Sequence, residues 1–248
     1  MDQVRQKVSV ITVVYNDVTH IRETMESFFT QTWEDKEYIV IDGGSTDGTV
    51  DIIREYADKI AFWCSEPDDG IYDAMNKGIC HATGDWINIL NSGDVFVSEQ
   101  VLARCMELSR GTNADIIYGN SLEISKGKSR HIEAYADTKI MELVPAYRHG
   151  SSFVKAKVHK ANLFDLNKRT QLGYALDWEL IHRLYKQGVS FSKLDLEIQS
   201  FRKEGISDNT IQSYWYNYKI TSEEQFNLRK LLHFIRITIT TLIKEVLS

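Results

Sequence analysis

The chain has 248 residues, a formal net charge of −6 and 43% hydrophobic residues. This length suits a single α/β domain with a sizeable core, and the acidic balance offers no basic stripe to neutralise the phosphates of a nucleic acid. Cys64, Cys80 and Cys105 are too widely spaced for a zinc or redox motif, so we expect buried thiols in a reducing cytoplasm. The first residues do not resemble a secretory signal.

The first predicted elements are a strand, a helix and a second strand. Residues 8–16 read VSVITVVYN, an apolar run that is typical of a buried parallel strand and ends in a polar pair. Ile21, Met25 and Phe28 then recur at helical spacing. Residues 37–49 begin with another apolar run and end in a glycine-rich turn, and a further helix is expected after the turn. This repeated order predicts an open α/β sheet that binds its ligand at the carboxyl ends of the strands.

An acidic loop and a short helix follow at residues 65–78, which read SEPDDGIYDAMNKG. The next apolar strand, residues 86–90, leads into a polar turn at residues 91–94, NSGD, which ends in a carboxylate. That turn is also expected at the ligand-binding edge of the sheet. Asp73 and Lys77 lie one helical turn apart, so they could pair with each other, or Lys77 could contact a phosphate.

Four of these segments together resemble glycosyltransferase family 2, the inverting nucleotide-sugar transferases of the GT-A fold. They are Tyr15-Asn16 and the segments 41–49, 70–78 and 91–94, which follow in the expected order and spacing over the first hundred residues. The strings GIYDAMNKG and LNSGD look like the branch of the family that assembles bacterial surface polysaccharides. The resemblance implies an α/β GT-A fold, with a mostly parallel central sheet flanked by helices and a C-terminal amphipathic helix.

The resemblance also implies an activity of the hexosyltransferase type. A sugar would pass from a nucleotide-diphosphate donor, with a UDP-sugar favoured over a GDP-sugar, to a hydroxyl of a glycan or lipid-linked acceptor of a capsule, exopolysaccharide or O-antigen. Direct displacement needs a base for the acceptor hydroxyl and stabilisation of the leaving diphosphate, for which we expect Mn²⁺ or Mg²⁺. The alternative is a non-catalytic nucleotide-sugar-binding or scaffold relative of the same fold.

The nucleotide pocket is expected to draw residues from all four motifs. By resemblance it comprises Thr12, Tyr15, Asn16, Asp42, Gly44, Ser45, Asp73, Asn76, Lys77, Asn91, Ser92 and Gly93. Asp42 is expected to hydrogen-bond the nucleobase, although an aspartate here could also hold its own turn. Many relatives have a second aspartate where this chain has Gly43, so one possible contact to the base is absent.

The metal and the catalytic base are assigned to three further side chains. Asp94 is the predicted metal ligand, with His149 near the metal or the diphosphate. The usual earlier acidic positions of the turn are Asn91 and Gly93 here, which predicts weak cation affinity in the empty enzyme. The resemblance makes Asp177 the general base. The alternative for Asp177 is a helix N-cap, and Glu179 is the local rival.

The sequence divides into a predicted transferase domain, residues 1–210, and a helical tail, residues 211–248. Within the tail, apolar and basic residues are expected on opposite faces of one helix. The apolar face has Leu228, Leu231, Ile235, Leu242 and Val246, and the basic face has Arg229, His233, Arg236 and Lys244. Such a helix is too short and charged to span a bilayer. We expect a cytoplasmic protein whose tail lies on the inner face of the membrane, or packs on its own domain or a partner subunit.

Overall fold

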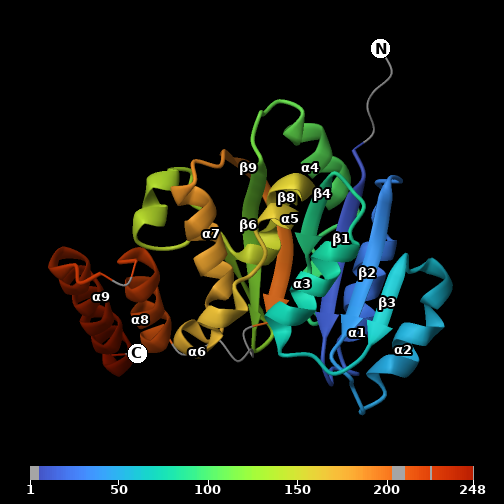
Figure 1. Cartoon of the computed structure of the whole chain (residues 1–248), viewed down its shortest axis with the longest axis horizontal. Helices are drawn as coiled ribbons and strands as arrows, with labels where there is room; N and C mark the ends of the chain where they lie inside the picture. Colours follow the sequence, from blue (N-terminus) through green and yellow to red (C-terminus); the bar gives the residue numbers. More distant parts are fainter. Residues whose placement is uncertain (1–5, 203–209, 224, 248) are drawn as a thin grey trace.

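The computed structural model describes residues 6–202, 210–223 and 225–247. Within these residues, a nine-stranded sheet has helices on both of its faces (Figure 1). The strands are β1 (Val8–Val14), β2 (Lys36–Asp42), β3 (Phe62–Ser65), β4 (Trp86–Ile89), β5 (Val95–Phe96), β6 (Ile116–Ser125), β7 (Lys128–Ile132), β8 (Ser152–Lys155) and β9 (Phe191–Arg202).

The helices alternate with the strands in the first half of the chain and are more irregularly placed in the second. The α-helices are α1 (Ile21–Phe29), α2 (Thr49–Glu55), α3 (Ile71–His81), α4 (Val101–Ser109), α5 (Ala156–Ala161), α6 (Arg169–Leu172), α7 (Leu176–Lys186), α8 (Thr210–Thr221) and α9 (Leu228–Leu247). Short 3-10 turns are η1 (Ala57–Lys59), η2 (Thr138–Glu142), η3 (His149–Ser151) and η4 (Leu166–Lys168).

The strand order creates a switch point beside β1. The order is β3-β2-β1-β4-β8-β6-β9-β5, with β7 paired to β6. The chain moves from β1 outward to β3 and then returns to β4 on the other side of β1, and these four strands are parallel. Open α/β sheets bind ligands at such a point, outside the carboxyl ends of the strands. The second half of the sheet is mixed, because β8 runs antiparallel to both β4 and β6.

Two hydrophobic layers hold the helices to the sheet. Along β1, Ile11 and Val13 face the layer that contains α3 and α7, whereas Val10 and Val14 face the layer that contains α1 and α4. This alternation follows from the two-residue repeat of a strand. Full burial of each such side chain contributes about 1.5–3 kcal/mol. Both faces are apolar, which explains the continuous hydrophobic run of residues 8–14.

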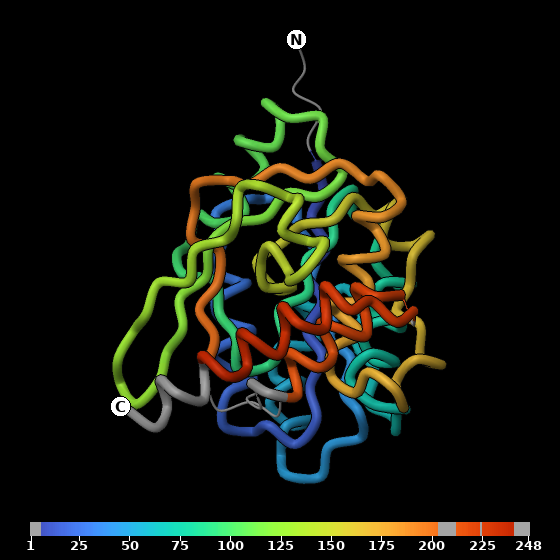
Figure 2. The backbone as a smooth tube through the Cα atoms, turned by 90° about the vertical axis from the view of Figure 1, so that its left-hand side faces the viewer, coloured from blue at the N-terminus to red at the C-terminus, as the bar shows by residue number. Residues whose placement is uncertain are grey.

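The tail adds two helices to one end of the molecule. α8 lies beside α7, and α9 lies outside α8 at the molecular surface (Figures 1 and 2). No helix of the described chain combines the length and apolar character needed to cross a bilayer. The thiol prediction holds for Cys105, which is buried, but it is wrong for Cys80, which is exposed at the end of α3.

Candidate functional site

Three turns interlock at the carboxyl edge of the parallel strands. The Oδ1 atom of Asn16 accepts a hydrogen bond from the Thr46 amide at 2.8 Å, and the Oγ atom of Ser45 accepts one from the Asn16 amide at 2.7 Å. Ser92 then donates to Asp17 at 2.7 Å, which joins the turn after β4 to the turn after β1. The predicted neighbours from separate motifs therefore meet at one place, with Asn16 at a φ of 49°, a conformation that asparagine tolerates.

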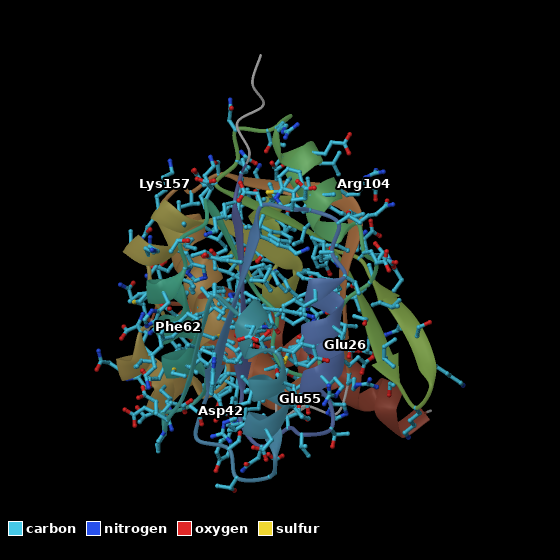
Figure 3. All side chains as sticks on the ribbon, turned by 90° about the vertical axis from the view of Figure 1, so that its right-hand side faces the viewer. Glu26, Asp42, Glu55, Phe62, Arg104 and Lys157 are labelled. Carbon is cyan, nitrogen blue, oxygen red and sulfur yellow. The ribbon has the colours of Figure 1, made fainter. Side chains whose placement is uncertain are left out.

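Asp42 holds the central turn. Its carboxylate accepts hydrogen bonds from the Gly44 amide at 3.0 Å, from the amide and hydroxyl of Ser45, and from the Ser65 hydroxyl at 2.6 Å. The residue is fully buried and lies at the lower end of β2 (Figure 3). Gly44 has a φ of 85°, which favours glycine. The structure gives Asp42 the turn-holding role, and its contact to a nucleobase remains a prediction.

Two predicted pocket residues bind groups within the fold, and their contact to a nucleotide remains a prediction. Thr12 is fully buried, and its hydroxyl donates to the Leu90 carbonyl at 2.7 Å. The side-chain amide of Asn76 binds both backbone groups of Phe164, donating to the carbonyl at 3.0 Å and accepting from the amide at 2.9 Å. Thr12 thus joins adjacent strands, and Asn76 fastens α3 to the segment before η4.

Other predicted pocket residues lie closer to solvent at the same edge. Tyr15 is 66% exposed after β1. Lys77 forms ion pairs with Glu66 at 3.0 Å and with Asp73 at 3.4 Å. The predicted pairing of Asp73 with Lys77 is therefore observed, while a phosphate contact by Lys77 remains a prediction.

The turn after β4 presents one carboxylate for a metal. Burial raises the pKa of Asp94 to about 7, and the charge of Arg148 opposes that shift only in part. No described residue donates a hydrogen bond or forms an ion pair with this carboxylate. In the same turn the Oδ1 atom of Asn91 is buried with no hydrogen-bond partner among the described residues. Oxygen donors lacking partners suit Mg²⁺ or Mn²⁺ in kind.

His149 is the first residue of η3. Burial lowers its pKa to about 4, with a contribution from Arg148, so the imidazole is neutral and can act as a ligand. Its ring lies 5.6 Å from that of Phe164, between centroids. Within the described parts of the chain, no three acidic, histidine or cysteine side chains form a preassembled metal cluster.

Asp177 lies in the first turn of α7. Ala175 is the N-cap, so the N-cap alternative for Asp177 is wrong. Its Oδ1 atom is 3.3 Å from the hydroxyl of Tyr72, which also donates to the Tyr174 carbonyl at 2.7 Å. Burial raises the pKa of Asp177 above its ordinary value, against hydrogen bonding from the Trp178 amide and the charge of Arg148.

The rival Glu179 faces the other way. It pairs with Lys168 at 2.7 Å and with Arg183 at 3.3 Å. Helical geometry places positions 179, 182, 183 and 186 opposite position 177. These positions line a cavity of about 720 Å³ between α7 and α8. That cavity therefore lies on the far side of α7 from Asp177 and is separate from the edge where the turns meet.

Three residues that the sequence did not single out belong to this edge. Asp68 approaches Gly43 so closely that its Oδ2 atom would lie 2.7 Å from a Cβ added there, so a carboxylate occupies the region of the missing second aspartate. Tyr72 connects α3 to Asp177. Arg148 stacks over Phe201 at 3.5 Å from the ring centre. Its positive charge opposes the rise that burial causes in the pKa of Asp94 and of Asp177. In the sequence, the signal for Arg148 was its position next to the predicted ligand His149.

The fold and this edge define an α/β protein whose polar turns meet at the switch point of its parallel strands. The family model "Glycosyl transferase family 2" matches residues 9–174, and the chain belongs to this family. An uncharacterised glycosyltransferase of Mycobacterium tuberculosis is 44% identical over 105 residues, which cover 42% of this chain and 40% of that protein. The chain thus spans less than half the length of that relative.

Solved structures share the fold at low sequence identity. Staphylococcus aureus TarS 1-349 in complex with UDP has a TM-score of 0.67 at 17% identity, covering 88% of this chain and 65% of that one. The mannosyltransferase PcManGT from Pyrobaculum calidifontis, in complex with GDP-Man and Mn²⁺, has a TM-score of 0.66 at 16% identity, covering 94% and 69%. These similarities confirm the predicted GT-A fold.

Proposed function

We propose that the chain is an inverting transferase that moves a sugar from a nucleotide-diphosphate donor to a hydroxyl of a glycan or lipid-linked acceptor in bacterial polysaccharide assembly. Family membership supports sugar transfer in general. The observation that carries the proposal is the 3.3 Å contact between Tyr72 and Asp177, because it brings α7 beside the acidic loop that packs on the turn after β2. Donor and base would then face the same space.

The donor would bind at the interlocked turns with its diphosphate towards Asp94. A UDP-sugar is the first choice and a GDP-sugar the second, in line with the ligands of the TarS and PcManGT structures. Asp94, with the orphan oxygen of Asn91 and the neutral ring of His149, would hold a divalent cation, which acts as a Lewis acid towards the leaving diphosphate when bound.

Asp177 would remove the proton of the acceptor hydroxyl. The acceptor oxygen then forms a bond to the anomeric carbon as the bond from that carbon to the diphosphate oxygen breaks, and the electron pair leaves with the diphosphate. The raised pKa of Asp177 brings it closer to the operating pH, which improves a general base. Arg148, whose charge reaches both Asp94 and Asp177, is suited to stabilise the negative charge on the leaving group.

The test is release of nucleoside diphosphate from a panel of UDP-sugars and GDP-sugars, with Mn²⁺ and an extract of lipid-linked glycans as acceptor. Release with one donor, dependent on acceptor and lost in Asp177→Asn, is the expected result. Binding of a nucleotide sugar without turnover by the wild-type chain would support the non-catalytic alternative.

A further inference from the structure

The outer face of α9 carries a stripe of apolar side chains that no described residue covers. Its members are Leu228, Leu232, Ile235 and Ile239, with exposed fractions between 45% and 57%. Spacings of four, three and four residues place them along one line of a helix. Phe226, 76% exposed, extends the line just before the helix. We call these five residues the α9 stripe.

The orientation of α9 is fixed by its opposite face. Phe234 is buried and its ring lies 6.2 Å from that of Tyr218 on α8. α8 in turn contacts the main domain, where the Tyr216 hydroxyl approaches Gly173, and Lys186 of α7 pairs with Glu223 at 2.9 Å. The helix is therefore packed on the protein at the outer side of α8 (Figure 2). The high exposure of the stripe residues shows that the stripe points away from this contact. The alternative that the tail packs on its own domain therefore explains the burial of the inner face of α9, but it does not explain the apolar outer face.

Positive charge flanks the stripe on one side. Arg229 and Arg236 are both exposed, and helical geometry puts them about 80–100° around the axis from Leu228. Between residues 228 and 240, where the side chains of α9 are described, the sequence contains no aspartate or glutamate. The whole chain has a net charge of −6, so the positive charge beside the α9 stripe is concentrated at this face.

We propose that the α9 stripe lies on an anionic lipid surface, with its apolar side chains among the acyl chains and Arg229 and Arg236 at the level of the phosphates. Apolar burial and attraction to anionic headgroups act together in such helices. A second copy of the chain fits less well. A two-fold symmetric, antiparallel pairing of two stripes would bring the arginine row of each helix against that of the other, and like charges at that distance repel.

The experiment is co-sedimentation of the full chain with vesicles, either of phosphatidylcholine alone or with about a third phosphatidylglycerol. We expect binding to the anionic vesicles only, weakened by 0.5 M salt. The double variant Arg229→Gln/Arg236→Gln should bind about thirty-fold more weakly, since each cation near the surface contributes several-fold. Leu232→Ser/Ile239→Ser should lose at least tenfold. All four side chains are exposed, so the chain should remain folded.

The matched control is Arg104→Gln/Leu108→Ser on α4. Both side chains are exposed, and Arg104 lies at the upper edge of the molecule, remote from the turn that contains Asp42 (Figure 3). This control should bind as the wild type does. Equal binding of the α9 variants and the wild type, equal binding to both vesicle types, or a dimer in light scattering that the α9 variants dissociate would overturn the proposal. The assay involves no sugar transfer, so its outcome is independent of the proposed activity.

Discussion

The two halves of the sheet build the site in different ways. In the parallel half, β1 to β4, each functional turn follows its strand directly, and the turns bind one another through Asn16, Ser45 and Ser92. In the mixed half, Arg148, His149 and Asp177 come from a 3-10 turn, its flank and a separate helix. The first half is thus organised by local sequence and the second by tertiary packing, which explains why one half contains recognisable motifs.

The largest expected effect comes from a substitution in the mixed half of the sheet. Asp177→Asn should lower kcat for transfer about a thousandfold, because a positioned general base contributes about 10²–10⁴-fold. Donor binding should persist, since the interlocked turns are unchanged. Steady-state kinetics with titration calorimetry of the donor measures both quantities.

The control for Asp177→Asn is Glu179→Gln on the opposite face of α7. Glu179 is buried against Lys168 and Arg183, so the variant should lose stability while the folded fraction keeps its kcat. Full transfer activity in Asp177→Asn, or a comparable loss of kcat in Glu179→Gln, would refute the role assigned to Asp177.

The next effect concerns the amino-terminal edge of the parallel half. Burial alone would raise the pKa of Glu37, but hydrogen bonds from Lys7, Ser9 and Thr83 lower it to about 2. A lowered folded-state pKa stabilises the fold above the unfolded pKa of about 4.3, and this stability is lost as the pH falls towards 2. The loss should be about 3 kcal/mol.

Urea unfolding between pH 6 and pH 2 measures this dependence, with Glu37→Gln as the comparison. The variant should be less stable at pH 6 and should show a correspondingly flatter decline in acid. A wild-type decline that is unchanged in Glu37→Gln would assign the acid sensitivity to other carboxyl groups.

A smaller effect tests the bonds that Asn76 makes to the segment before η4. Asn76→Ala removes both hydrogen bonds to the backbone of Phe164 and should lower the free energy of unfolding by about 2 kcal/mol. The exposed Asn167 in η4 is the control, and Asn167→Ala should cost less than about 0.5 kcal/mol. Thermal unfolding measures stability, and donor affinity should be unchanged in both. A stable Asn76→Ala variant with weakened donor binding would instead support the predicted pocket role.

The smallest effect concerns Lys77. Its partners Glu66 and Asp73 are at the surface, where such pairs contribute about 0–1 kcal/mol. Lys77→Met should therefore change stability by only about 0.5 kcal/mol, so the variant stays folded and its donor affinity tests the predicted phosphate contact. If calorimetry shows a tenfold loss of affinity, Lys77 contacts the phosphates.

The sequence predicted the fold class and the meeting of the turns because strand periodicity and turn residues are local properties. It also predicted a helix at α9. It could not predict the hydrogen bonds that Thr12 and Asn76 make within the fold, because these bonds reach Leu90 and Phe164, which are distant in the chain. Similarly, Asp68 replaces a carboxylate near Gly43 through folding alone, and no motif records this.

Hydrogen exchange of the full chain with UDP and Mn²⁺ tests the central claim, that the donor binds where the parallel strands end. The account predicts slower exchange of backbone amides in residues 43–48 and 91–94, with no change in residues 218–223 beside the cavity on the far face of α7. Protection confined to the cavity, with the turns unaffected, would contradict it.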